Sequence, residues 1–300
     1  MFAEAREHLS TIRDWLRYAV SRFNGAGLTF GHGCTNAHDE AAYLILHSLH
    51  LPIERLEPYL DARLTPHEME LLAQVLHERI HRRLPAPYIT HEAWLQGYRF
   101  YVDERVIVPR SYLAPLILER FQPWLAEPDH VIRALDLCTG SGCLAVLLAH
   151  AFPAASIDAI DASADALAVA SRNIADHGVD ARVRLLHSDL FASLTGCTYD
   201  LIVTNPPYVD ARSMAELPPE YRHEPRQALA AGEDGLDLVR RILAEAPEHL
   251  NPGGLLAVEI GHNRPALEAA YPALPFLWPE VEGGEDTVFL ITREELGVAG

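Results

Sequence analysis

The chain has 300 residues, and hydrophobic residues make up 49% of them, which is enough to form a folded core. Its formal net charge is −18, and all 24 basic residues are arginine, so the sequence excludes lysine-nucleophile and Schiff-base chemistry. The acidic balance argues against extensive nucleic-acid binding, because phosphate backbones are repelled, and it favours a basic partner. A role of the acidic surface in solubility alone stays open.

The opening residues, the apolar runs and the cysteines bear on the compartment. Residues 1–10 lack the basic-then-apolar pattern of a signal peptide. No apolar run approaches the roughly 18 residues that a membrane span requires, so we expect a cytoplasmic protein. The four cysteines lack the paired spacing of a zinc site; they are expected to be free thiols, and no metal is predicted.

Residues 1–87 are predicted to form a helical module, to which we assign substrate recognition. Apolar residues recur there at helical spacing, first over positions 2–20 and again over 41–49. Another helix is expected to begin at Thr65, since Pro66 suits its first turn and Glu68 stands where a capping box requires an acid. This helix ends in a basic cluster made of Arg79, Arg82 and Arg83.

Residues 88–110 are predicted to be a β-ribbon that links two domains. Pro85 and Pro87 end the helical module immediately before it. Extended runs are expected over 94–97, 98–102 and 106–108, with breaks at Gly97 and at Asp103–Glu104.

Strand-like and helix-like segments alternate from Val131 onward, which is typical of an α/β domain, and we assign residues 111–300 to it. Strands are expected over 132–137, 156–160, 182–186, 201–204 and 255–260, and helices over 144–151 and 165–177. The near-continuous apolar character of the strands favours a parallel sheet covered on both faces. A last strand over 287–292 is expected to be antiparallel and to pair with residues 276–281.

The first strand leads into a glycine-containing loop, Asp136-Leu-Cys-Thr-Gly140-Ser-Gly142, and then into a helix. Glycines allow a backbone to turn tightly and to pass close to a ligand. The loop has no Gly-Lys-Ser/Thr triplet, which argues against a phosphate-cradling loop. Alone, such a loop is common to nucleotide and dinucleotide binders.

Aspartates at the ends of the next strands indicate an adenosine ligand. Asp161 follows the second strand and can accept hydrogen bonds from both ribose hydroxyls. Its alternative role is to cap the next helix, which Ser163 can do instead. Asp189 ends the third strand, where it is expected near the adenine, with Leu190 as an apolar face beside the ring. With Asp136, three strands thus end in aspartate, although a nicotinamide dehydrogenase stays possible on these residues alone.

The fourth strand ends in Asn205-Pro206-Pro207-Tyr208, which predicts the chemistry. A planar NH2 group can donate one hydrogen to the Asn205 side-chain carbonyl and the other to the Pro206 carbonyl, while Tyr208 offers a flat aromatic surface. These acceptors raise the electron density on a weakly nucleophilic nitrogen and fix its line of attack, so no general base is expected. The alternative is that the motif is only a turn.

Together these features resemble the protein glutamine-N5 methyltransferases. The similarity spans nearly the whole chain, from the helical module and β-ribbon to the cofactor loop, the Asn-Pro-Pro-Tyr motif and the terminal hairpin. It implies an α/β fold with a Rossmann-like, seven-stranded methyltransferase sheet and S-adenosylmethionine as the methyl donor. It also implies cofactor contacts along Cys138-Thr139-Gly140-Ser141-Gly142, at Asp161 and at Leu190, with Asn205 shared between cofactor and glutamine.

The family has two branches, which act on translation release factors and on the large-subunit ribosomal protein L-three. Residues 101–110, the loop from Cys138 to Cys143 and the stretch Tyr221-Arg-His-Glu-Pro225 are similar to the ribosomal branch. Release-factor enzymes usually have a Gly-Thr-Gly-Thr-Gly loop, and in this chain Cys138 replaces the first glycine of that loop. The resemblance therefore implies that the substrate and partner is L-three, a basic ribosomal protein.

Three alternative functions stay open. The first is methylation of a release factor. The second is adenine-N6 methylation of DNA or RNA, because adenine presents the same planar NH2 group. The third is a non-catalytic ribosome assembly factor that binds an adenosine ligand. Four residues also keep open roles, either at the substrate pocket or as structural or surface groups: Arg110, His223, Glu224 and Glu259.

Overall fold

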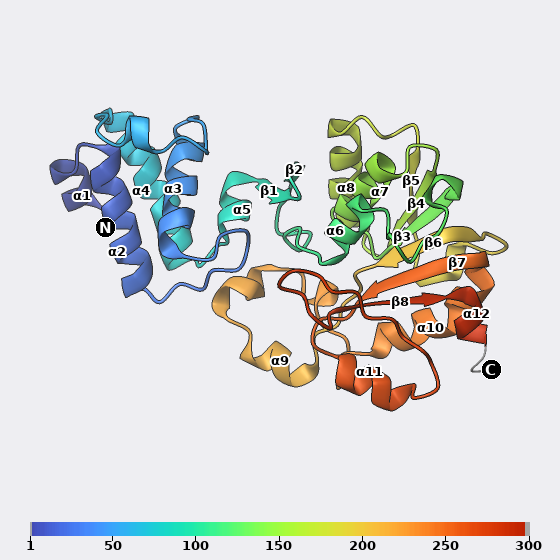
Figure 1. Ribbon diagram of the computed structural model, residues 1–300. Helices are drawn as coiled ribbons and strands as arrows, with labels where there is room; N and C mark the ends of the chain where they lie inside the picture. The colour runs from blue at the N-terminus through green and yellow to red at the C-terminus, as the bar shows by residue number, and fades with distance from the viewer. Residues whose placement is uncertain (1, 298–300) are drawn as a thin grey trace. The chain divides into compact units, whose positions relative to one another are not determined.

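The computed structural model describes residues 2–297 (Figure 1). By its contacts the chain divides into two compact units. One, the helical unit, comprises Met1–Ala93 and Pro218–His223, and the other, the sheet unit, comprises Trp94–Leu217 and Glu224–Gly300. The helical unit thus extends beyond residue 87, where we expected the module to end, and it includes a short segment from much later in the chain.

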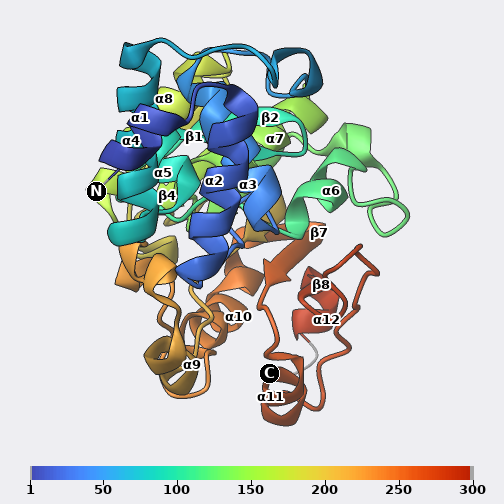
Figure 2. The same cartoon turned by 90° about the vertical axis from the view of Figure 1, so that its left-hand side faces the viewer.

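The helical unit contains three helices that begin at a residue whose side chain caps the first turn. Its elements are α1 (Ala3–His8), α2 (Ile12–Gly25), α3 (Ala37–Ser48), the 3-10 turn η1 (Glu57–Tyr59), α4 (Pro66–His81), α5 (Ala86–Thr90) and the 3-10 turn η4 (Pro219–His223). The predicted capping box is confirmed, because Thr65 Oγ1 accepts from the Glu68 N–H and the Glu68 carboxylate accepts from the Thr65 N–H. Helices α2, α3 and α4 pack side by side around Trp15, Phe23 and Leu44 (Figure 2).

A buried ionic cluster holds the helical unit together. Arg79, which belongs to the basic cluster in the sequence, is 1% exposed. Its guanidinium donates to the carboxylates of Glu40 (2.5 Å) and Glu220 (3.5 Å) and to the Thr29 carbonyl (2.9 Å). Arg83 donates to the same Glu220 oxygen at 3.1 Å. The segment Pro218–His223 is therefore joined to this unit by the ion pairs of Glu220 with Arg79 of α4 and with Arg83, which follows α4.

A short ribbon follows the helices. It consists of β1 (Glu92–Leu95) and β2 (Tyr98–Tyr101), joined at Gln96 and Gly97, whose φ angles of 51° and 79° suit a tight hairpin turn. The prediction of a further extended run over 106–108 is wrong as a strand. Val106 and Val108 are buried, and the Val108 N–H donates to the Glu224 carboxylate instead of to a neighbouring strand.

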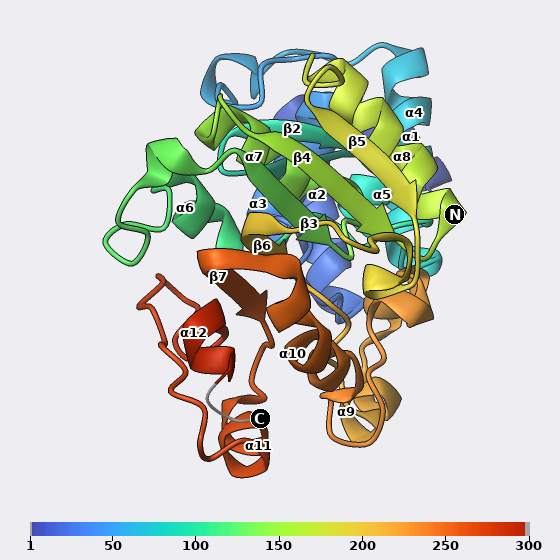
Figure 3. The same cartoon turned by 90° about the vertical axis from the view of Figure 1, so that its right-hand side faces the viewer.

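The sheet unit has a mixed, mainly parallel sheet (Figure 3). Its strands are β3 (Arg133–Leu137), β4 (Ser156–Asp161), β5 (Val183–His187), β6 (Tyr199–Thr204), β7 (Leu250–Glu259) and β8 (Val288–Thr292), in the order β5-β4-β3-β6-β7-β8. Neighbouring strands are parallel except β7 and β8, which are antiparallel as predicted. The α/β fold class is therefore confirmed.

The expected seventh strand is reduced to one bridge. Leu277 and Leu290 exchange backbone hydrogen bonds of 3.0 and 2.8 Å in the predicted antiparallel direction. Among the described residues, however, the sheet has six full strands. The segment lies between Pro275 and Pro279, and since proline has no N–H to donate, the ladder cannot extend past them.

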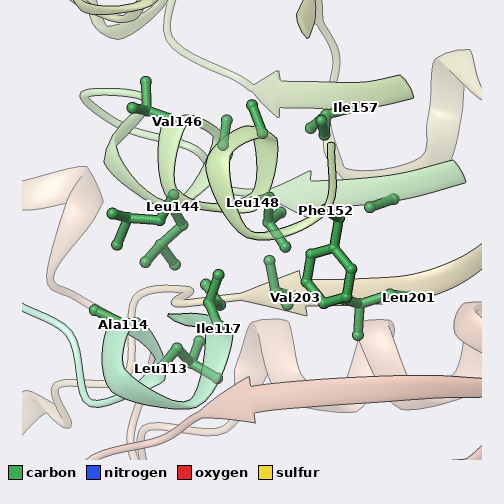
Figure 4. Packing of buried hydrophobic residues seen from close by; sticks show 14 of the residues in the cluster. Leu113, Ala114, Ile117, Leu144, Val146, Leu148, Phe152, Ile157, Leu201 and Val203 are labelled. Carbon is green, nitrogen blue, oxygen red and sulfur yellow. The ribbon is translucent and has the colours of Figure 1, made fainter. Parts of the chain in front are cut away.

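Helices cover both faces of the sheet. The elements outside the sheet are α6 (Leu113–Leu118), η2 (Pro128–His130), α7 (Cys143–Ala151), α8 (Ala164–Asp176), η3 (Leu190–Ser193), α9 (Ala211–Glu216), η5 (Arg226–Ala228), α10 (Asp237–His249), α11 (Arg264–Ala270) and α12 (Arg293–Leu296). On one face, α6 and α7 pack against Leu201 and Val203 of β6 (Figure 4). On the other, α10 packs against Ile202 of β6. Alternate residues of one strand thus enter two cores.

Three further observations concern membranes, metals and thiols. None of the described helices is long and apolar enough to cross a membrane. Within residues 2–297, no three His, Cys, Asp or Glu side chains are grouped so as to hold a metal ion. The four cysteines are free thiols, as predicted.

Candidate active site

A cavity opens at the carboxyl ends of the parallel strands. All of its lining belongs to the sheet unit. Seven of the predicted site residues line it: Cys138, Gly140, Asp161, Asp189, Leu190, Asn205 and Pro207. The structure therefore brings together the ends of β3, β4, β5 and β6, as expected for ligands of doubly wound sheets.

The loop after β3 is shaped by a buried aspartate and by glycines. Asp136 Oδ2 accepts hydrogen bonds from Thr139 Oγ1 (2.5 Å) and from the Ala145 N–H (2.9 Å). Its other oxygen, Oδ1, is buried and has no hydrogen-bond partner among the described residues. Burial raises the pKa of the Asp136 carboxyl to about 7. At Gly142 (φ 80°) an added Cβ would come within 3.0 Å of the Ala170 Cβ, so the close approach of loop and α8 requires glycine.

Asp161 joins this loop to the end of β4. Its Oδ2 accepts from the Gly140 N–H at 2.9 Å, and its Oδ1 accepts from the Ser163 N–H at 2.8 Å. Burial raises the pKa of this carboxyl above its ordinary value. Ser163 is the N-cap of α8, where its Oγ accepts from the Ala166 N–H. Asp161 is therefore released from the capping role and lies in the cavity wall.

The residues after β5 contribute one charged and one apolar group. Leu190 is 4% exposed, adopts a positive φ of 46° and lines the cavity. Asp189 also lines it, but its carboxylate forms a two-point ion pair with Arg241 of α10, at 3.0 and 3.1 Å. The sequence did not predict Arg241 as a site residue, because it lies 52 residues from Asp189 and no motif marks the two as partners.

The Asn-Pro-Pro-Tyr motif directly follows β6. The Asn205 Nδ2 donates to the Arg110 carbonyl at 3.5 Å, and Pro206 is buried. The Tyr208 hydroxyl donates to Glu259 Oε1 at 3.4 Å, and the Tyr208 ring lies against Gly261, where an added Cβ would come within 2.7 Å of it. The motif is therefore held at both ends.

The four residues with open roles are placed as follows. Glu224 is buried and accepts two hydrogen bonds from the Arg110 guanidinium. Glu259, at the end of β7, is 2% exposed and accepts from Ser111 Oγ and from the Tyr112 N–H. Burial raises the pKa of Glu259 to about 7. His223 belongs to the helical unit, where its ring lies 2.7 Å from the Arg82 carbonyl.

Comparisons with known proteins place this geometry in a family. Residues 116–218 match the methyltransferase small domain. The ribosomal protein uL3 glutamine methyltransferase of Neisseria meningitidis serogroup A is 58% identical over 296 residues, covering 99% of this chain and 97% of that protein. The enzyme of the same name from Bordetella pertussis is 54% identical over 291 residues, covering 97% and 98%.

A solved structure supports the fold alone. The hMettl16 catalytic domain, in complex with MAT2A 3′UTR hairpin 6, is similar with a TM-score of 0.50 and 14% identity, over 75% of this chain and 80% of that one. The relatives, in contrast, share more than half of their residues with this chain over nearly its full length. The predicted family is therefore confirmed: the chain belongs to the ribosomal protein uL3 glutamine methyltransferases.

Proposed function

We propose that this protein transfers a methyl group from S-adenosylmethionine to the side-chain amide nitrogen (N5) of a glutamine in ribosomal protein uL3, which is L-three. The observation that carries the proposal is the junction at the end of β6. There Asn205 and Pro207 line the same cavity as Asp161 and Leu190, so an amide-binding motif borders an adenosine-binding wall. The names of the relatives support uL3 as the substrate.

The residues of the cavity fit S-adenosylmethionine. Each Asp161 oxygen accepts one backbone N–H and keeps a lone pair for a ribose hydroxyl. Leu190 and Ile160 offer apolar walls for the adenine. Each Asp189 oxygen accepts one hydrogen bond from Arg241 and keeps a lone pair for the exocyclic amine. Asp136 is not among the lining residues, but its buried Oδ1 has no hydrogen-bond partner among the described residues, and we assign it to the ammonium group of the methionyl end. We assign backbone contacts to the loop over Cys138, Thr139, Gly140, Ser141 and Gly142.

The motif residues bind and orient the glutamine. The Asn205 side-chain carbonyl and the Pro206 carbonyl accept the two amide hydrogens, and the Tyr208 ring supports the amide plane. Pro206 and Pro207 carry no N–H, so no competing donor faces the substrate nitrogen. When bound, S-adenosylmethionine supplies the methyl group as an electrophile on its sulfonium sulfur. The contribution of the protein is alignment of the nitrogen and added electron density on it.

The net charge of the chain and its sequence identity to the relatives favour uL3 over the alternative substrates. Cys138 stands where release-factor enzymes usually have glycine, and the relatives at 54–58% identity carry the uL3 name. The net charge of −18 argues against a nucleic-acid substrate, and so do the internal contacts made by the basic cluster of Arg79, Arg82 and Arg83. Arg79 is buried and Arg83 donates a hydrogen bond to Glu220, so two of the three arginines form ion pairs inside the protein.

Three further assignments rest on the same argument. We assign substrate recognition to the helical module of residues 1–87, because the cavity lining lies entirely in the sheet unit. The β-ribbon (88–110) then links it to the methyltransferase domain (111–300). An enzyme that modifies a ribosomal protein belongs in the cytoplasm, and its acidic surface suits a basic protein better than a membrane or nucleic acid.

The test is a methyl-transfer assay with labelled S-adenosylmethionine, offering uL3, a release factor and adenine-rich DNA side by side. We expect label on uL3, located at a glutamine by mass spectrometry. Label only on the release factor would keep the chemistry and overturn the substrate. Label only on DNA would overturn both.

A further inference from the structure

The segment Val108–Tyr112, called here the bracket, is held by two buried carboxylates. Glu224 Oε1 accepts from the Val108 N–H (2.9 Å) and from the Arg110 guanidinium (2.5 Å), and its Oε2 accepts from the same guanidinium at 2.6 Å. Glu259 Oε2 accepts from Ser111 Oγ (2.5 Å) and from the Tyr112 N–H (2.9 Å). Glu224 therefore holds the first half of the bracket, at Val108 and Arg110, and Glu259 holds the second half, at Ser111 and Tyr112.

The bracket and its glutamates reach both ends of the Asn-Pro-Pro-Tyr motif. At one end, the Arg110 carbonyl accepts from Asn205 Nδ2 at 3.5 Å. At the other, the second oxygen of Glu259 accepts from the Tyr208 hydroxyl at 3.4 Å. The two side chains that would grip the substrate amide are therefore set by one structural unit.

The contact to Arg110 decides which end of the Asn205 amide faces the substrate. With its NH2 group toward the Arg110 carbonyl, Asn205 keeps its Oδ1 as an acceptor for the glutamine. The flipped amide would place two acceptors against each other at the bracket and present a donor to the substrate NH2 group. The position of the Arg110 carbonyl therefore selects the productive orientation.

A purely structural role does not account for the burial of these two glutamates. Glu224 is 4% exposed and Glu259 is 2% exposed. Burying a carboxylate costs free energy that apolar residues of similar size avoid, so filling the core does not explain either residue. Each instead accepts three hydrogen bonds directed at the bracket or at the motif.

We propose that Glu224 and Glu259 are positioning residues, which act through the bracket to set the Asn205 amide and the Tyr208 ring around the substrate amide. The inference rests on the proposed function. Glu224 acts on Asn205 through Arg110, and Glu259 acts on Tyr208 directly and on the bracket through Ser111. Neither glutamate lines the cofactor cavity, so their effect falls on turnover and not on cofactor affinity.

The test uses the full chain with Glu224→Gln and Glu259→Gln. Its control is Asp158→Asn, the same kind of change in another two-point arginine pair, with Arg184, in the amino-terminal half of β4. We measure kcat and KM for uL3, the Kd of S-adenosylmethionine by calorimetry, and the melting temperature. Each glutamate variant is expected to lose roughly 10- to 100-fold in kcat, with the cofactor Kd within about threefold of wild type. The control keeps its kcat.

A kcat within about twofold of wild type in both variants would overturn the inference. So would a parallel loss of kcat and cofactor affinity, since that marks a general structural defect. If either variant fails to fold, Arg110→Lys and Ser111→Ala are judged by the same two criteria. The wild-type protein is assayed before any variant is compared. If it labels no glutamine of uL3, the proposed function itself is overturned.

Discussion

At the scale of single residues, the site works through side chains whose partners are distant in sequence. The strand-end residues Asp161, Asp189 and Asn205 could be predicted to lie together, because the carboxyl ends of parallel strands share one edge of the sheet. Their partners could not. Arg241 is 52 residues from Asp189, and Glu224 is 114 residues from Arg110. No local periodicity specifies such pairs, which form only when the loops have packed.

Replacing Asn205 with alanine tests the residue on which the proposed chemistry depends. Asn205→Ala removes the acceptor for one amide hydrogen, and kcat is expected to fall by roughly two orders of magnitude or more. Cofactor binding should largely persist, because Asp161 and Leu190 remain. Turnover on uL3 and calorimetric titration with S-adenosylmethionine measure the two effects. A variant that retained full activity in cells would instead support a non-catalytic assembly factor.

Gly261 offers a way to disturb Tyr208 without changing it. Gly261→Ala places a Cβ within 2.7 Å of the Tyr208 ring, at a φ of 56°. We expect the ring to be displaced, so that kcat/KM for uL3 falls at least about tenfold. The matched control is Gly253→Ala, which has a similar positive φ of 73° but nothing within 4 Å of the added Cβ. Equal losses in both variants would attribute the effect to backbone strain and not to Tyr208.

The pKa of Asp136 gives a prediction for stability against pH. Its carboxyl has an ordinary pKa of 3.8 and a pKa of about 7 in the folded protein, because burial disfavours the charged form. The folded state therefore holds a proton that the unfolded state releases, so the contribution of Asp136 is greatest below pH 4 and is lost as the pH rises through 7. The difference in free energy of unfolding between wild type and Asp136→Asn should fall by a few kcal/mol over this range. A difference that stays constant with pH would contradict the assigned pKa.

At the scale of elements, the predicted starts and types of the segments agree with the structure where local chemistry sets them. The helix at Thr65 has its capping box, and the parallel strands lie close to their expected positions. The predictions were wrong or incomplete where tertiary contacts decide. Residues 106–108 give their backbone donor to Glu224, and the segment around Leu277 is limited by flanking prolines. The inclusion of Pro218–His223 in the helical unit had no sequence signal at all.

The ionic cluster on α4 predicts a large difference between two nearby arginines. Arg79→Ala leaves Glu40 and Glu220 buried without their shared cation, and it should lower the free energy of unfolding by about 3–5 kcal/mol. Arg82 is exposed and pairs with Glu78 one turn away, so Arg82→Ala should change stability by less than about 1 kcal/mol. Denaturant titration of both variants measures this. Equal losses would mean that the Arg79 cluster adds nothing beyond a surface pair.

At the scale of the whole molecule, charge bears on how the substrate is met. The net charge of −18 is carried without any lysine, while the cavity itself is lined by two carboxylates, those of Asp161 and Asp189. Local contacts therefore serve the amide and the cofactor, whereas the overall field acts on the approach of a basic protein. These two contributions respond differently to salt, because screening weakens long-range attraction more than it weakens short hydrogen bonds in the cavity.

Ionic strength should therefore separate substrate encounter from chemistry. Raising sodium chloride from about 0.05 M to about 0.5 M is expected to lower kcat/KM for full-length uL3 by roughly tenfold, mainly through KM, with kcat nearly unchanged. The control is a short peptide that contains the modified glutamine and has a net charge near zero, for which kcat/KM should change by less than about twofold. If the protein and the peptide responded equally to salt, steering by the acidic surface would be refuted and the charge would be assigned to solubility alone.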